Sequence, residues 1–313
     1  MNKQTTNAIL MIRPVQFRMN EQTAVNNYYQ KIIDNINSDE VNQLAVNEFD
    51  SFVRILRDAG VQVIVVDDTK DFDTPDSIFP NNWVSFHCDG TAALYPMFAK
   101  NRRDERKESI LQAVEANGFQ IKTVMDYTNA EHEQVFLEGT GSVILDRDNR
   151  KAYCALSPRA DEGLFIEFCE DFEYTPVVFS AYQSVNNTRK KIYHTNVMMC
   201  LGDTFAVICL DSIDDKKEQN LVISHLKKDR KTIIEITESQ VNQFAGNMLQ
   251  LNDAKGNSLL IMSQSAKDSL TSNQLNQLQG HAKIVSSSLN IIEACGGGSA
   301  RCMMAEIFLP KAN

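Results

Sequence analysis

Two cysteines and three glycines lie together near the end of the chain, in the stretch ACGGGSARC (Ala294–Cys302). A cysteine acts as a nucleophile when it is partly exposed and has electropositive neighbours. Cys302 follows the glycines and stands beside Arg301, so we expect it to be the reactive thiol. Cys295 ends the apolar run LNIIEAC and is expected to be a core residue. The stretch matches neither GxGxxG nor GxxxxGK[ST], so a nucleotide-binding loop is not predicted.

A hairpin pattern recurs along the chain. Segments that begin at Asn81, Gly139, His194 and Gly246 each contain a polar or small lead-in, a short apolar strand, a tight turn and a second strand. The spacing of roughly 55 residues is the scale of a supersecondary repeat. A fifth glycine-led segment, from Gly296, ends the chain. The pattern therefore predicts five similar modules.

Helical periodicity appears between the hairpin strands and the strands that follow them. The predicted helices cover residues 39–60, 102–118, 160–172, 214–229 and 272–282. Tight antiparallel hairpins argue against a doubly wound parallel sheet, because parallel neighbours need long crossovers. Radial closure would protect the strand edges of repeated modules. We therefore predict an α/β fold, a five-bladed pseudo-symmetric α/β propeller of ββαβ modules, with both termini completing the fifth module and residues 1–313 forming a single domain.

The five lead-ins would meet around the axis of such a ring. A lone histidine or glutamate is best explained as a core or surface group, but joint placement at equivalent positions favours a function. Nucleophile, base and acid would then converge, as covalent cysteine catalysis requires. The residues at these positions are Asn81, Asn82, Glu138, His194, Asn196, Asn247 and Cys302.

Composition limits the partners. The net charge of −10 argues against nucleic acid, whose phosphates need a basic face. No apolar run approaches the roughly 20 residues of a membrane span, and the apolar stretch near the N-terminus is too short for a signal peptide. We expect a cytoplasmic protein with reduced thiols and a small-molecule substrate, without a metal or organic cofactor. The sequence carries no signal for an oligomeric state.

Three motifs resemble those of a known superfamily. The stretches FLEGTGSVILD (136–146), YHTNVMMC (193–200) and GGGSARC (296–302) are similar to the Glu-Gly-Gly, His-x-Asp and Gly-Gly-Gly-x-x-Cys signatures of the guanidino-group-modifying enzymes. This pentein, or amidinotransferase, superfamily includes arginine and agmatine deiminases, dimethylargininases and glycine amidinotransferase. The resemblance extends over residues 9–310. It implies a five-module α/β propeller with Cys302 as nucleophile, His194 as acid and base, and Glu138 orienting the reacting group.

The resemblance also suggests how the amino-acid end of a substrate is bound. PMFAKNRRDE is similar to a dimethylargininase stretch that binds the substrate carboxylate, which maps onto Arg102 and Arg103. ALSPRADEG is similar to a second such stretch and points to Arg159. The guanidinium fork suits a carboxylate because it donates two parallel hydrogen bonds. The alternative for Arg102 and Arg103 is a solvated helix start.

Three asparagines depart from the superfamily pattern. Asn196 stands where the motif has aspartate, and Asn81 and Asn82 stand where an acid is usual. A guanidinium has only N–H donors and favours carboxylates, whereas a ureido group also has a carbonyl that asparagine can bind. We therefore expect a citrulline hydrolase that releases ornithine, carbon dioxide and ammonia, similar to the citrulline-utilisation hydrolases. The alternatives are a guanidine hydrolase of the arginine deiminase or dimethylargininase type, an amidinotransferase with an amine acceptor, and, more distantly, a non-enzymatic propeller that only binds.

Overall fold

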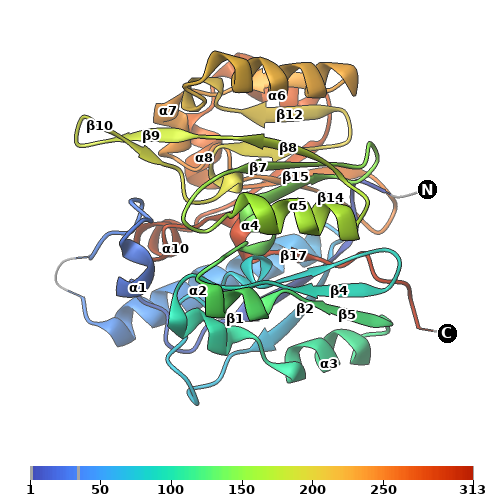
Figure 1. Cartoon of the computed structure of the whole chain (residues 1–313). Helices are drawn as coiled ribbons and strands as arrows, with labels where there is room; N and C mark the ends of the chain where they lie inside the picture. Colours follow the sequence, from blue (N-terminus) through green and yellow to red (C-terminus); the bar gives the residue numbers. More distant parts are fainter. Residues whose placement is uncertain (1–2, 34–35, 313) are drawn as a thin grey trace.

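A computed structural model describes residues 3–33 and 36–312 of the chain (Figure 1). Within these residues lie five three-stranded sheets and one two-stranded hairpin. In each three-stranded sheet an antiparallel pair is followed by a parallel third strand. The sheets are β17 (Ala305–Glu306), β1 (Ala8–Arg13) and β2 (Gln62–Asp67); β3 (Val84–Phe86), β4 (Thr91–Leu94) and β5 (Thr123–Asp126); β6 (Val143–Asp146), β7 (Lys151–Ala155) and β8 (Thr175–Phe179); β11 (Met199–Leu201), β12 (Phe205–Ile208) and β13 (Thr232–Glu235); β14 (Leu249–Asn252), β15 (Ser258–Ser263) and β16 (Lys283–Ser287).

Helices connect the second strand of each sheet to the third, as a parallel pair requires. They pack on the third strands: α6 contacts β8 and β13, and α2 contacts β2 and β16. Figure 1 shows α3 and α6 on the outside, at the bottom and the top of the view. The connecting helices are α1 (Glu21–Ala24), α2 (Ser38–Asp58), α3 (Glu108–Ala116), α5 (Glu162–Asp171), α6 (Lys216–Lys228), α8 (Gln264–Ser269) and α9 (Ser272–Gln279). Three further helices lie between one sheet and the next: α4 (Gly139–Ser142), α7 (Glu238–Val241) and α10 (Asn290–Gly296).

The longest of these helices, α2, is fixed by its start and by its apolar face. The Asn37 side chain accepts from the backbone of Glu40, and the Glu40 side chain accepts from the backbone of Asn37, which forms a capping box. Phe49, Phe52 and Leu56 are fully buried along one face. Their spacing of three to four residues is the helical period, so one stripe faces the core.

The helix predicted over residues 102–118 is divided in the structure. A 3₁₀ helix covers Lys100–Glu105, and α3 begins only at Glu108. The Arg102 guanidinium turns inward to the Glu105 carboxylate, three residues later. A 3₁₀ helix aligns residues i and i+3, which an α-helix does less closely. The buried ion pair therefore explains the break.

The hairpin of β9 (Tyr182–Val185) and β10 (Thr188–Lys191) was not predicted. Its turn residues Asn186 and Asn187 have φ of 49° and 59°, as in a type I′ turn. Most of its side chains are polar, so the sequence lacks the apolar alternation that identifies a half-buried strand.

The lead-ins of the sheets lie close together. Short helices precede β3, β6, β11 and β17, at Pro80–Asn82, α4, Thr195–Val197 and Ala300–Met303. Of these, α4 contacts the helices Pro80–Asn82 and Thr195–Val197, and Pro80–Asn82 contacts Ala300–Met303. The first strands also contact one another, β17 with β3 and β11 with both β6 and β14. The predicted meeting of distant lead-ins is therefore present. In the described part of the chain, no helix combines the length and apolarity of a membrane span.

The buried stripe of α2 gives a stability test. Phe52 is 0% exposed, whereas Leu44 on the same helix is 40% exposed. Phe52→Ala should lower the free energy of unfolding by about 3–5 kcal/mol through lost burial and cavity formation. Leu44→Ala should change it by less than about 1 kcal/mol. Urea unfolding of both variants measures the difference, and equal losses would contradict this packing of α2.

Candidate active site

Cys302 lies in the 3₁₀ helix Ala300–Met303, buried under two carboxamides. Asn247 Nδ2 lies 3.3 Å from the Cys302 Sγ and Asn196 Nδ2 lies 3.6 Å from it. Asn247 Oδ1 accepts from the Arg301 backbone N–H at 3.0 Å. Because its oxygen is engaged there, the Asn247 amide must turn its N–H₂ group toward the sulfur. The two carboxamides therefore fix the position of the sulfur.

His194 and Glu138 form a buried pair in the neighbouring lead-ins. His194 Nε2 donates to Glu138 Oε2 at 2.7 Å, and Phe98 N donates to Glu138 Oε1 at 3.0 Å. Burial would raise the pKa of Glu138, but the Arg159 charge and the His194 hydrogen bond outweigh it and lower the pKa to about 2. Burial lowers the pKa of His194 to about 4, against the opposing effect of Glu138. At neutral pH the pair is therefore a carboxylate and a neutral imidazole, with Nδ1 as the acceptor.

A glycine makes room for this pair. A Cβ atom at Gly141 would lie 2.5 Å from Asn82 Nδ2 and 2.8 Å from His194 Nδ1. Both distances are too short for any side chain. The second glycine of the FLEGTG motif is therefore needed because two site residues approach the backbone closely.

Arg102 and Cys302 line one small cavity, which is described below. The N–H donors of Arg102 are engaged within the protein. Nε and Nη2 each donate to the Glu105 carboxylate at 2.9 Å. Nη1 donates to Asn82 Oδ1 at 2.8 Å, and Nη2 also donates to Phe79 O at 3.1 Å. The side chain is only 2% exposed. The predicted solvated helix start does not apply to Arg102, and its visible role is to hold Asn82 in position.

Arg159 joins the Glu138 carboxylate to the segment of residues 20–30, which we name the cover segment. Arg159 Nη1 lies 3.4 Å from Glu138 Oε2. Its Nε donates to Asn26 Oδ1 at 2.8 Å and its Nη2 to Thr23 O at 2.9 Å. The guanidinium also stacks over the Tyr193 ring, 4.7 Å from its centroid. Arg159 therefore connects Glu138 to the cover segment.

Among the predicted residues, Asn81, Arg103, Glu138 and Asn196 do not line the cavity of Cys302. Glu138 and Asn196 contact its lining residues His194 and Cys302. Arg103 donates to Met97 O at 3.1 Å and pairs with Glu131 at 3.3 Å, and it does not line the cavity. Asn81 lies behind Asn82, whose Nδ2 donates to Asn81 Oδ1 at 3.1 Å. In each pair of adjacent residues, one lines the cavity and the other does not: Arg102 and Asn82 line it, whereas Arg103 and Asn81 face away.

Asp76 lines the cavity and was missed by the sequence analysis. Its Oδ2 accepts from Asn20 Nδ2 at 2.8 Å and from Thr23 Oγ1 at 3.1 Å. Its Oδ1 is buried without a hydrogen-bond partner among residues 3–33 and 36–312. A buried acceptor of this kind needs a donor. The available signal was its place in TPDSIFPNN, just before the asparagines. The site therefore holds a second acidic side chain besides Glu138, which the sequence motifs did not identify.

The cavity shared by these groups is small. Its volume is about 10 Å³, room for about one water molecule. It is lined by Asn27, Asp76, Phe79, Asn82, Arg102, Arg159, Tyr193, His194, Gly296, Gly298 and Cys302. The cover segment seals it, since Asn27 Nδ2 and Gln30 Nε2 both donate to Gly296 O, at 3.2 and 3.1 Å. The cavity as it stands is too small for an amino acid.

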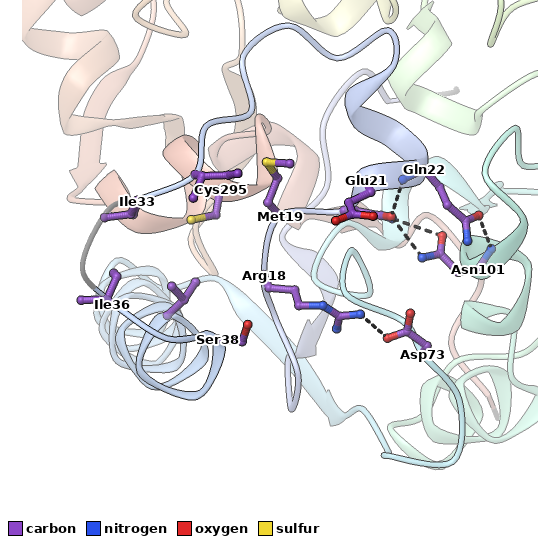
Figure 2. Close-up of a pocket in the computed structure, with 13 residues that line it drawn as sticks. Arg18, Met19, Glu21, Gln22, Ile33, Ile36, Ser38, Asp73, Asn101 and Cys295 are labelled. Carbon is purple, nitrogen blue, oxygen red and sulfur yellow. Dashed lines mark hydrogen bonds and ion pairs between the residues drawn. The ribbon is translucent and has the colours of Figure 1, made fainter.

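A separate cavity of about 410 Å³ lies on the outer side of the cover segment (Figure 2). Figure 2 shows Arg18 pointing toward Asp73, and Gln22 beside Asn101. Cys302 and His194 do not line this cavity. Within the described residues, no group of three or more histidine, cysteine or acidic side chains could hold a metal ion.

Known structures share this fold. ArgZ, an arginine dihydrolase from the ornithine–ammonia cycle in cyanobacteria, superposes with a TM-score of 0.73 at 18% identity, over 97% of this chain and 41% of that one. Its substrate-bound N-terminal domain matches with a TM-score of 0.70 at 18% identity, over 96% and 99%. A dimethylarginine dimethylaminohydrolase carrying an S-methyl-L-thiocitrulline adduct matches with 0.62 at 14% identity, over 98% and 100%. The chain thus spans about two fifths of full-length ArgZ.

Together with the family model, these comparisons place the chain in the pentein superfamily. Over residues 13–309 it matches the model of the family described as N,N dimethylarginine dimethylhydrolase, eukaryotic, and it belongs to that family. A search of curated proteins found no match.

The neutral state of His194 gives a pH test. The folded chain protonates His194 only near pH 4, whereas an unfolded chain does so near 6.5. Between these values the unfolded state binds more protons, so the free energy of unfolding falls as pH decreases, by up to about 3 kcal/mol. His194→Gln should remove this part of the slope between pH 6.5 and 4. Urea unfolding at several pH values measures it, with His132→Gln as the exposed-histidine control. Identical slopes for wild type and His194→Gln would contradict the assignment.

Proposed function

We propose that the chain is a cysteine-dependent hydrolase of the guanidino group of an arginine-like amino acid. The observation that carries this proposal is that Cys302, His194 and Asp76 line one buried cavity, and that His194 is hydrogen-bonded to Glu138 behind it. Asp76 and Glu138 supply carboxylate oxygens of the kind that a cationic, donor-rich substrate needs. The family description, which names a dimethylarginine hydrolase, supports the same substrate class.

The fold proposal completes this arrangement. We propose that the five sheets close into a pseudo-symmetric five-bladed propeller and that the chain is a single domain. The contacts between first strands, and the contacts of α2 and α6 with the third strands of two sheets each, support this. A closed ring would explain why residues from three distant lead-ins reach one cavity.

Each step of the proposed mechanism uses a group in the cavity. The Cys302 sulfur attacks the central guanidino carbon while neutral His194 takes the thiol proton. The resulting imidazolium is stabilised by Glu138 and passes its proton to the departing amine, leaving an S-linked intermediate. His194 then takes a proton from water, which attacks that carbon and releases the sulfur. Asn196 and Asn247 hold the sulfur between steps through their N–H₂ groups.

Charged residues of the cavity would bind the two ends of the substrate. Arg159 donates to Asn26 of the cover segment, so a substrate carboxylate would replace that oxygen when the cover opens. The unpartnered Asp76 Oδ1 suits a cationic group of the substrate. Arg102 acts as a positioning residue for Asn82. Arg103, which lies outside the cavity, is given no part.

Citrulline has less support than a guanidine. The family description and the names of the matching structures concern arginine or its methylated forms, and Asp76 restores a carboxylate to the site. The comparisons also give no support to membership of the citrulline-utilisation hydrolases. Asn82 and Asn196 are the residues that distinguish this site from one rich in carboxylates. Analysis of the reaction products distinguishes a citrulline substrate from a guanidine.

Product analysis tests this proposal. The enzyme is incubated separately with arginine, dimethylarginine, citrulline and agmatine, with and without an amine acceptor, and ammonia, dimethylamine, citrulline and ornithine are measured. We expect turnover of arginine or dimethylarginine without an acceptor. Cys302→Ser should lose about 1,000-fold or more in kcat, and the control Cys295→Ser should keep its activity. Turnover of citrulline alone would replace the guanidine proposal with the ureido one, and an absolute need for the acceptor would indicate amidino transfer.

The carboxamide donors give a test that needs no substrate. Asn247→Leu removes an N–H donor from the sulfur, and Asn247→Asp puts a negative charge there. Alkylation of Cys302 by iodoacetamide at pH 7 should slow by about tenfold in Asn247→Leu, because the sulfur loses the N–H donor that holds it in place. It should slow further in Asn247→Asp. Mass spectrometry of the Cys302 peptide gives the rates, and rates equal to the wild type in both folded variants would contradict the role.

A further inference from the structure

A cavity of about 440 Å³ lies at the far end of the strands from Cys302. Strands β3 and β6 begin at the lead-ins of the candidate active site and run away from it. The cavity is bounded by the turns that follow these two strands, at His87 and Arg147, and by Phe308 near the end of the chain. It shares no lining residue with the cavity of Cys302. It is therefore a separate site.

Arg147 is a largely buried residue whose guanidinium has no acceptor among the described residues. Its side chain belongs to a residue that is only 6% exposed. Its guanidinium makes no hydrogen bond or ion pair with residues 3–33 or 36–312, and its recorded contact is the Phe308 ring, 3.9 Å from the centroid. A guanidinium carries five N–H donors, and those of Arg147 are accessible from the cavity rather than fully buried. The donors face a cavity that Arg147 lines, where a ligand could accept from them.

The acidic residues that line the cavity are exposed, whereas Arg147 is largely buried. Asp89, Asp171 and Glu173 line the cavity but are exposed. Asp171 accepts from the Tyr127 hydroxyl at 2.8 Å, and Glu173 pairs with Arg150 at 3.8 Å. The acidic groups thus have other partners or solvent, and none neutralises Arg147.

Flat aromatic surfaces form the walls. The Phe308 ring lies against Arg147, the Tyr174 ring lies 4.4 Å from the Arg150 guanidinium, and the His87 ring stacks on Phe172 at 4.0 Å. Burial, followed by the charges of Arg147 and Arg150, lowers the pKa of His87, so its ring adds no charge at neutral pH. An anion with a flat apolar body matches such walls, because its body can pack on the rings.

We propose that this cavity binds a small carboxylate with a planar or apolar body, and that Arg147 donates to the carboxylate oxygens. A guanidinium fork suits this group through two parallel hydrogen bonds. The inference stands apart from the proposed catalytic function, since the residues and the end of the fold are different. Inorganic phosphate offers the same oxyanion chemistry without the apolar body, so the test separates the two.

Calorimetric titration of the whole chain with benzoate, acetate and inorganic phosphate tests the proposal. Benzoate should bind most tightly. Arg147→Met keeps the apolar stem and should weaken benzoate binding by about tenfold or more. Arg54→Met, an exposed arginine on α2, removes the same charge elsewhere and should leave binding unchanged. Cys302→Ser should also leave it unchanged. Absence of benzoate binding to the wild type, equal binding by Arg147→Met, or binding of phosphate in preference would overturn the proposal.

A second measurement uses only the wild-type chain, in case Arg147→Met does not fold. Phenylglyoxal modifies accessible arginines, and peptide mass spectrometry gives the rate at each one. Benzoate should slow the modification of Arg147 several-fold while that of Arg54 stays the same. Equal rates at Arg147 with and without saturating benzoate would refute the assignment.

Discussion

The site depends on one buried carboxylate. Glu138 is fully buried and receives N–H donors from three directions: the imidazole of His194, the backbone of Phe98 and the guanidinium of Arg159. A buried charge is tolerated only when it is paired and hydrogen-bonded. The hydrogen bond to Glu138 also fixes the tautomer of His194: Nε2 carries the proton, and Nδ1 is left to accept and release protons.

The same carboxylate connects the floor of the site to its cover. Arg159 bridges Glu138 and the Asn26 side chain of the cover segment, and Asp76 binds the same segment through Asn20 and Thr23. When the cover moves, both Arg159 and Asp76 lose partners at once. A zwitterionic amino acid offers a carboxylate and a cation to replace them. The contacts that close the site are therefore of the kind that a substrate can exchange.

The sequence predicted what depends on periodicity and on repetition. The recurring hairpins and their lead-ins identified Glu138, His194 and Cys302 as neighbours, because residues at equivalent places in similar modules meet wherever the modules meet. Individual side-chain directions depend on local packing instead. Arg102 and Arg103 are adjacent, and only the buried partner Glu105 decides which one turns inward. Asp76 was missed because its partners in the cover segment lie more than fifty residues earlier in the chain. The polar hairpin of β9 and β10 was missed because no apolar alternation marks it.

The central claim is that Cys302 forms a covalent bond with the guanidino carbon. The most direct measurement is mass spectrometry of the intact wild-type chain and its peptides after rapid acid quenching during turnover of arginine or dimethylarginine. Acid stops the reaction before water resolves the intermediate, so an amidino-type adduct should be found on the Cys302 peptide. The peptide that contains Cys295 should remain unmodified. A consumed substrate with no adduct on Cys302, or an adduct on another residue, would contradict the account.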